Sequence, residues 1–194
     1  AGPASPAIPV GSVQGYEITG GHTAAAFAGI TFVNVESANA SRNRIDTIGG
    51  TGISVVNTGS TQASGTFASN GIFNTGGDGI HFDLSDNSTS TYTVSDSGFQ
   101  NLTANAVRLQ TADSATYDVN VTRSGASGLS NAAIYLDAGD DSSGSLSVSN
   151  SAFDGGGVDA DLAGNASSTL AVTGVRIEND PNSAVRLDAA GASN

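Results

Sequence analysis

The sequence predicts one all-β domain, folded as a parallel β-solenoid in which short strands stack coil upon coil. The first observation is a repeat of 27 residues, marked by a small residue followed by a branched aliphatic one. A fixed period in this range is typical of solenoids, in which each repeat buries its apolar face against its neighbours. The second observation is that apolar and polar residues alternate within short runs, as in strands with one buried face. The marker pairs are Gly29-Ile30, Gly52-Ile53, Gly79-Ile80, Ala106-Val107, Ala133-Ile134, Gly157-Val158 and Ala184-Val185.

Three strands are expected in each repeat, separated by turns rich in Gly, Asn, Asp and Ser. The first strand begins at the aliphatic marker. The second strand carries apolar residues 12 and 14 positions later, and the third carries one 19 positions later. The second-strand pairs are Gly65 and Phe67, Tyr92 and Val94, Val119 and Val121, Leu146 and Val148, and Leu170 and Val172. The third-strand residues are Ile72, Phe99, Ala126, Phe153 and Ile177.

Equivalent strands of successive repeats are expected to stack in parallel, about 4.8 Å apart. An antiparallel sandwich is the competing architecture, since it also uses short strands and Gly-rich turns. A sandwich does not need one register held over five successive repeats, so the repeat favours the solenoid.

This pattern, over residues 29–188, resembles the right-handed parallel β-helix of the pectate-lyase type, a fold also used by autotransporter passengers and large adhesins. The resemblance implies a right-handed coil with three strands in each turn of ~27 residues, in about six to seven coils. Asn74, Asn101 and Asn179 each follow the third apolar site by two residues. They match an Asn that often stacks in a turn of that family, although such residues also serve single turns.

The composition is acidic, with a net charge of −12, and all six basic residues are arginine. This balance argues against nucleic acids and anionic membranes as partners, because phosphate binding needs basic patches. No apolar run approaches the ~18 residues of a membrane span. Cysteine is absent, which excludes disulfides and Cys-based metal sites. The acid-rich, lysine-free balance suits an extracellular or salt-exposed protein, so an extracellular or cell-surface location is expected.

The expected organisation is a Pro-rich N-terminal extension over residues 1–12 and one β-solenoid domain over residues 13–194, with incomplete terminal rungs. Residues 185–188 would form only the first strand of a rung, and residues 16–19 would supply later strands of another. Open solenoid ends expose strand edges and apolar core. Val185 and Leu187 are therefore candidate self-association residues for head-to-tail stacking, and excision from a longer chain is the alternative explanation.

The outward face of the first strands carries the residues best suited to chemistry. Asp83 and Asp137 lie two rungs apart, or about 9–10 Å, near the upper limit for an inverting carboxylate pair. His81, Arg108 and Tyr135 form a line that would suit contacts with sugars. The alternative is ordinary charge pairing on an exposed face.

Enzyme chemistry is not expected from the resemblance. The lyases of that family need a calcium-binding acidic cluster with an Arg or Lys base. Its hydrolases carry close Asp motifs with Gly-His-Gly and Arg-x-Lys segments. None of these is found, and a chain without lysine has no Arg-x-Lys. The catalytic and cofactor-binding sets are therefore expected to be empty.

An acidic column is expected in the turn after the first strand. Asp86, Asp113 and Asp140 are spaced by 27 residues, and Asp141 lies beside the last. Stacked carboxylates repel one another unless they are solvated or bridged, and Ca²⁺ prefers oxygen ligands of this kind. Calcium is thus the one metal predicted here, and a hydrated loop is the alternative.

The outward face of the second strands is dominated by small hydroxyl residues. Such a face fits a default surface, a lateral packing face between solenoids, or an ice-binding surface. The columns mix Thr with Ser, Ala and Asn, which argues against ice binding. The candidate binding residues are Ser64, Thr66, Thr91, Thr93, Ser95, Thr122, Ser147, Ser149 and Thr173.

The function predicted from the sequence is that of a non-enzymatic structural or adhesive β-solenoid, secreted or on the cell surface. In its strongest form it is a subunit of a head-to-tail filament. The expected partners are further copies of the chain or a cell-surface molecule, a glycan among them. The alternative function is a carbohydrate-active or carbohydrate-binding β-helix.

Overall fold

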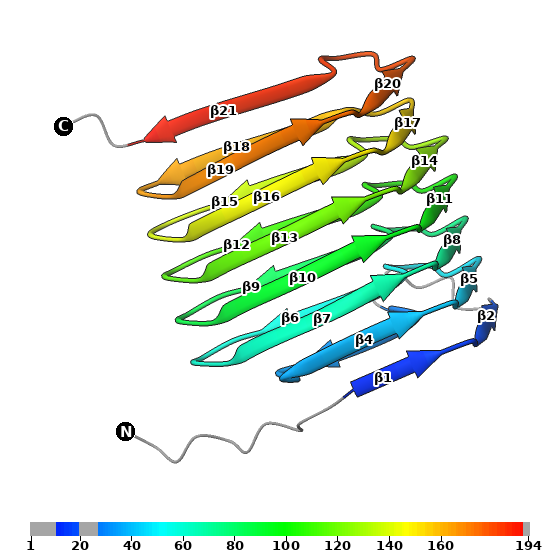
Figure 1. Ribbon diagram of the computed structural model, residues 1–194, viewed down its shortest axis with the longest axis horizontal. Helices are drawn as coiled ribbons and strands as arrows, with labels where there is room; N and C mark the ends of the chain where they lie inside the picture. Colours follow the sequence, from blue (N-terminus) through cyan, green and yellow to red (C-terminus); the bar gives the residue numbers. More distant parts are fainter. Residues whose placement is uncertain (1–10, 20–26, 192–194) are drawn as a thin grey trace.

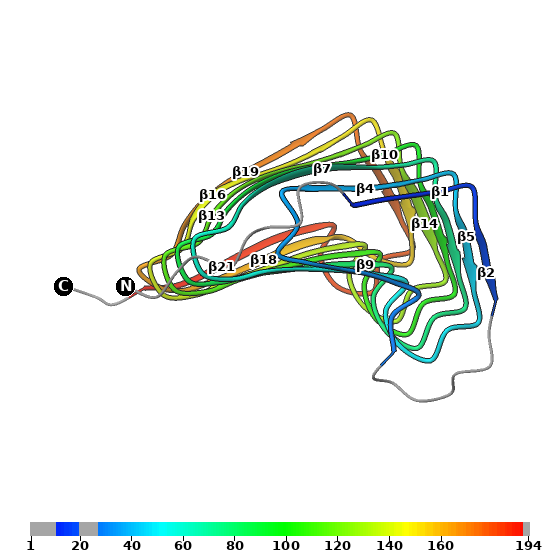
Figure 2. The same cartoon turned by 90° about the horizontal axis from the view of Figure 1, so that it is seen from below.

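The computed structural model describes residues 11–19 and 27–191, and these residues form three parallel sheets of seven strands each. Figure 1 shows the strands stacked along one axis, with β1 and β21 at opposite ends. Seen along that axis, the sheets enclose the core on three sides, and the chain winds as a right-handed coil (Figure 2). The predicted three-stranded solenoid is confirmed. Within the described residues no helix has the length and apolar character to cross a bilayer.

We call the sheets first, second and third after the order of strands in the repeat. The first sheet contains β3 (Ile30–Val33), β6 (Ile53–Asn57), β9 (Ile80–Leu84), β12 (Val107–Thr111), β15 (Ile134–Ala138), β18 (Val158–Gly164) and β21 (Val185–Gly191). The second contains β1 (Gly11–Gln14), β4 (Ser37–Ser41), β7 (Gln62–Ala68), β10 (Thr89–Ser95), β13 (Thr116–Thr122), β16 (Ser143–Ser149) and β19 (Ser167–Thr173). The third contains β2 (Glu17–Thr19), β5 (Arg44–Asp46), β8 (Gly71–Phe73), β11 (Gly98–Gln100), β14 (Gly125–Ser127), β17 (Ala152–Asp154) and β20 (Arg176–Glu178). Strand β1 begins inside the range expected for the extension, of which residues 1–10 lie outside the described residues.

The strand register follows the predicted repeat, because Ile53 pairs with Ile80 and Val107 pairs with Ile134. All strand pairs are parallel, which excludes the sandwich. Two marker spacings differ from 27: Ile30 and Ile53 are 23 residues apart, and Ile134 and Val158 are 24 apart. Both differences arise in turns. The spacing of 23 reflects a turn between β3 and β4 that is shorter than the turn between β6 and β7. The spacing of 24 reflects the short connection from β17 to β18.

The core is the column of inward side chains, most of which are fully buried away from the two ends. Aromatic rings fill its centre: Phe67 lies edge-on to Phe82 at 5.3 Å, and Phe82 stacks on Tyr92 at 4.8 Å. Gly65 makes room for this packing, since a Cβ atom there would lie 1.9 Å from the carbonyl oxygen of Ala38. Burying each large apolar side chain contributes about 1.5–3 kcal/mol, so the core is the main source of stability.

The coil turns its corners with left-handed backbone at the same position of successive rungs. In the turn from the second to the third sheet these residues are Gly15, Arg42, Ser69, Asp96, Arg123, Asn150 and Gly174. In the turn after the third sheet they are Thr47, Asn74, Asn101, Gly128, Gly155 and Asn179. The predicted Asn ladder forms in part: Asn101 donates to Asn74 over 3.2 Å, and Asn74 donates to Asp46 over 2.8 Å.

Replacing Phe99 with Asp is expected to abolish folding. Phe99 is 3% exposed and lies between Ile72 and Ala126, so the substitution would bury an unpaired carboxylate. Gln100→Asp is the matched control, because Gln100 points outward on the same strand. Circular dichroism melting should show no cooperative transition for the first variant and a near-normal one for the second. An unchanged melting midpoint for Phe99→Asp would contradict the register.

Candidate functional site

The outward face of the first sheet brings together a chain of charged and aromatic side chains. Arg108 donates to Asp137 over 3.1 Å, and its guanidinium lies 5.7 Å from the centre of the Tyr135 ring. The Tyr135 hydroxyl donates to Asp161 over 2.8 Å, and Arg186 donates to the other oxygen of that carboxylate over 3.1 Å. Each of these contacts joins neighbouring rungs, so side-chain interactions connect the rungs along the axis of the coil on this face.

Partial burial shifts the acid–base behaviour of this face. Burial and the hydrogen bond to Asp161 raise the pKa of Tyr135 to about 12. Burial also raises the pKa of Asp159, although the Arg186 guanidinium opposes the shift. The pKa of His81 is lowered, chiefly because burial disfavours the charged imidazolium. Its Nδ1 lies 3.9 Å from a carboxylate oxygen of Asp78.

The two carboxylates whose spacing is near the limit for an inverting pair lie on this same outward face. Register places Asp83 and Asp137 on either side of Gln110, two rungs apart as predicted. Asp137 is an ion-pair partner of Arg108, the charge pairing that was the alternative explanation.

The predicted acidic column serves the backbone. Asp86, Asp113 and Asp140 all have left-handed φ angles, of 59°, 56° and 56°. Each carboxylate accepts a backbone N–H from the preceding rung: Gly59 to Asp86 at 2.7 Å, Asp86 to Asp113 at 3.2 Å, and Asp113 to Asp140 at 3.2 Å. Asp141 accepts from the Asn165 amide over 2.9 Å. Over the part of the chain that the structure describes, no three acidic, His or Cys side chains form a group suited to a metal ion.

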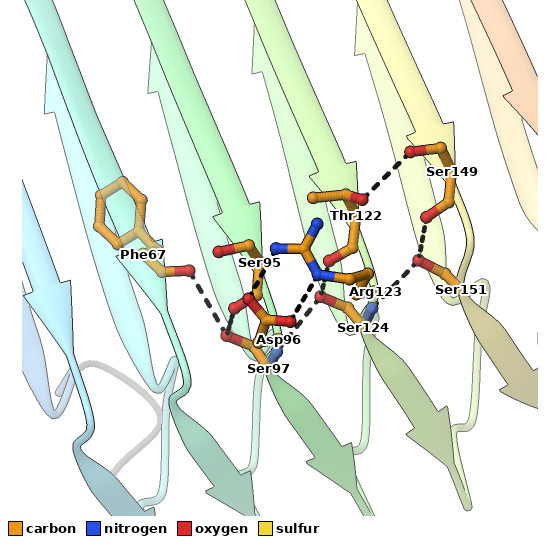
Figure 3. A network of polar contacts seen from close by, with 9 residues as sticks. All are labelled: Phe67, Ser95, Asp96, Ser97, Thr122, Arg123, Ser124, Ser149 and Ser151. Atoms are coloured by element: carbon orange, nitrogen blue, oxygen red, sulfur yellow. Dashed lines mark hydrogen bonds and ion pairs between the residues drawn. The ribbon is translucent and has the colours of Figure 1, made fainter.

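The hydroxyl face of the second sheet is formed in the predicted register, and most of its members are exposed or half-buried. Ser95 is the exception, with 8% of its surface exposed. It lies between Ala68 and Thr122 in the sheet and beside the Asp96–Arg123 ion pair, which together cover it (Figure 3). The candidate self-association residues lie at one end of the coil, where Val185 and Leu187 are 48% and 56% exposed.

A buried polar ladder in the turn between the second and third sheets was not predicted. Each rung's N–H donates to a side-chain oxygen of the next rung: Asn43 to Asn70 at 3.2 Å, Asn70 to Ser97 at 3.2 Å, Ser97 to Ser124 at 3.3 Å, and Ser124 to Ser151 at 3.1 Å. All five residues are at most 4% exposed. Their constant spacing of 27 residues was the available signal, hidden because serine is common throughout the chain.

Figure 3 shows the part of this turn ladder formed by Ser97, Ser124 and Ser151, with its outer layer. The Ser124 hydroxyl donates to the carbonyl of Thr122 over 3.1 Å, and Ser151 donates to that of Ser149 over 2.8 Å. Outside the ladder, Arg123 donates two hydrogen bonds, of 2.7 and 2.8 Å, to the carboxylate of Asp96 in the preceding rung. Hydroxyl groups therefore satisfy backbone groups both along and across the turn.

Comparison with family models, curated proteins and solved structures found no match for this chain.

His81 is expected to make stability fall on mild acidification. Because burial lowers its pKa in the folded state, the unfolded chain takes up a proton first as pH drops below about 6.5, which favours unfolding. The stabilisation is complete above the unfolded pKa and is lost as pH falls toward the folded one. Asp46 and Asp96, whose pKa values are lowered by bonds to Asn74 and Arg123, titrate below this window.

The measurement is the melting midpoint of wild type and His81→Gln at about pH 7.5 and about pH 5.5, on either side of the ordinary pKa. The wild type should lose more between the two conditions than the variant. Parallel losses in both proteins would show that His81 is not the titrating group.

Proposed function

We propose that this chain is a non-enzymatic structural or adhesive β-solenoid that acts as a stiff rod outside the cell or on its surface. The observation that carries the proposal is the buried turn ladder from Asn43 to Ser151. It adds axial hydrogen bonds at the corner between the second and third sheets, beside the backbone hydrogen bonds that join neighbouring rungs there. Buried and satisfied polar networks of this kind rigidify a fold.

Composition supports the extracellular setting. The chain has no cysteine and carries a net charge of −12, which favours solubility and does not suit nucleic acids. The stacked ladders stabilise the coil without disulfides. We also propose that the chain is related to the pectate-lyase-like β-helices and resembles the passengers of autotransporters and adhesins, with a cell-surface molecule or further copies as its partners.

The stiffness of the coil is tested by protease resistance. A folded sample should survive proteases below its melting temperature, because local opening breaks several ladders together. Ser124→Ala removes the acceptor for the buried N–H of Ser97 and should cost about 1–3 kcal/mol. Ser114→Ala, at an exposed turn position, should stay within about 0.5 kcal/mol. Rapid cleavage of the folded wild type would contradict the proposed stiff structural function.

Carbohydrate binding is the second candidate function, and the half-buried cluster of Arg108, Tyr135 and Asp161 favours it. Aromatic rings and charged groups held in fixed positions are what sugar recognition uses. These three side chains follow one another along the axis of the coil on successive rungs, an arrangement that an extended polysaccharide could follow.

The double variant Asp83→Asn with Asp137→Asn tests whether the chain cleaves polysaccharides. Because the Arg108–Asp137 pair is half-exposed, its loss should cost at most about 1 kcal/mol, and the rod should remain folded and protease-resistant. Incubation with acidic and neutral polysaccharides should reveal no cleavage by either protein. Cleavage by wild type that disappears in the double variant would replace the structural function with an enzymatic one.

A further inference from the structure

The two ends of the coil are complementary in strand order. Among the described residues, β1, β2 and β3 form one open end and β19, β20 and β21 form the other, each with a neighbour on one side only. The end at β21 exposes apolar surface, since Val185 and Leu187 point along the inward column of Val158 and Ala160 yet stay half-exposed. Figure 1 shows these two ends facing opposite directions along the axis.

Extending the register by one rung matches the ends position by position. Gly11 to Gln14 of a second copy would face Leu170 to Thr173, and Ile30 to Val33 would face Val185 to Asp188. Gly11 would face the inward Leu170, and the remaining inward pairs are all apolar. They are Val13 on Val172, Ile18 on Ile177, Ile30 on Val185, and Phe32 on Leu187.

The turns and charges match as well. Gly15 and Gly174 occupy the same corner of the coil, both with left-handed φ angles, of 73° and 63°. Glu17 of the second copy would lie beside Arg176, as it lies beside Arg44 within the chain at 3.5 Å. An acidic group would thus meet a basic one at the only charged position that β2 presents to its neighbour.

We propose that the end formed by β19, β20 and β21 binds the end formed by β1, β2 and β3 of a second copy by in-register parallel strand pairing. This inference rests on the proposed structural function and specifies its partner. Ile30 and Phe32 are already 7% and 5% exposed, so the apolar gain comes mainly from covering Val185 and Leu187, and the rest from pairing open strand edges. The contact is heterologous and does not close, so repetition gives filaments.

Sedimentation of the 194-residue chain tests the association. The wild type should form a concentration-dependent series of assemblies, strengthened by salt that screens the −12 charge of each copy. Leu187→Asp would bury a carboxylate against Phe32 and should weaken association at least about tenfold. Ala190→Asp is the matched control: it adds the same charge to an outward position of β21, beyond the stretch that β3 covers.

Cross-linking tests the register, because the chain has no cysteine of its own. Ser12→Cys with Ala171→Cys places two exposed thiols at facing positions, about 5 Å apart between Cα atoms, where a disulfide can form. Ser12→Cys with Thr169→Cys shifts one thiol by two residues, to about 8 Å, beyond disulfide reach. Oxidation should give a ladder of covalent multimers for the first pair alone.

The outcomes distinguish this inference from the proposed function. A wild type that stays monomeric at high concentration, yet resists proteases below its melting temperature, would overturn the stacking and leave the proposed structural function intact. Equal cross-linking of both cysteine pairs would overturn the register. Loss of association in Leu187→Asp counts in favour only where its melting transition is retained. If that variant unfolds, the cysteine pairs decide the question.

Discussion

The constraint on which this structure depends is that every position must fit the same position one rung away. Parallel strands in register place like residues in a column at the strand spacing of about 4.8 Å. Ile53, Ile80, Val107 and Ile134 form such a column in the first sheet. Changes in length are therefore confined to the turns, as the connections from β3 to β4 and from β17 to β18 illustrate. Inserting or deleting one residue inside a strand would turn all the later side chains of that strand to the wrong face.

The same constraint governs the polar residues, which must find partners in the next rung. In the acidic column each carboxylate accepts the N–H below it, which offsets the repulsion that stacked charges would otherwise produce. In the turn ladder, serine and asparagine oxygens do this in a buried setting. The ladder stops after Ser151, because the next rung places Val175 at that position. Beyond it the last coil lacks this support.

The apolar columns could be predicted from the sequence because period and residue type agree at each position. The polar columns could be predicted only in part. Serine occurs both on surfaces and at buried turns. The burial of a column such as Ser97, Ser124 and Ser151 therefore cannot be predicted from residue type alone. The first-sheet face was predicted in composition and register. Charge pairing on this face was one of the two explanations considered, but the particular partners of Arg108 and Tyr135 were not predicted, because they depend on side-chain reach across rungs.

The backbone hydrogen bonds between rungs also determine which surfaces can pair with the ends of the coil. Each interior rung satisfies its backbone groups on both sides, whereas the last rung leaves one side open, and the half-exposed Val185 and Leu187 lie there. Any cover for that end must present parallel strands in the same register and apolar residues at the inward positions. The first rung of this chain meets both conditions at β1, β2 and β3. In the proposed stacking, the net charge of −12 opposes the union of two copies, so ionic strength would set the balance between single coils and filaments.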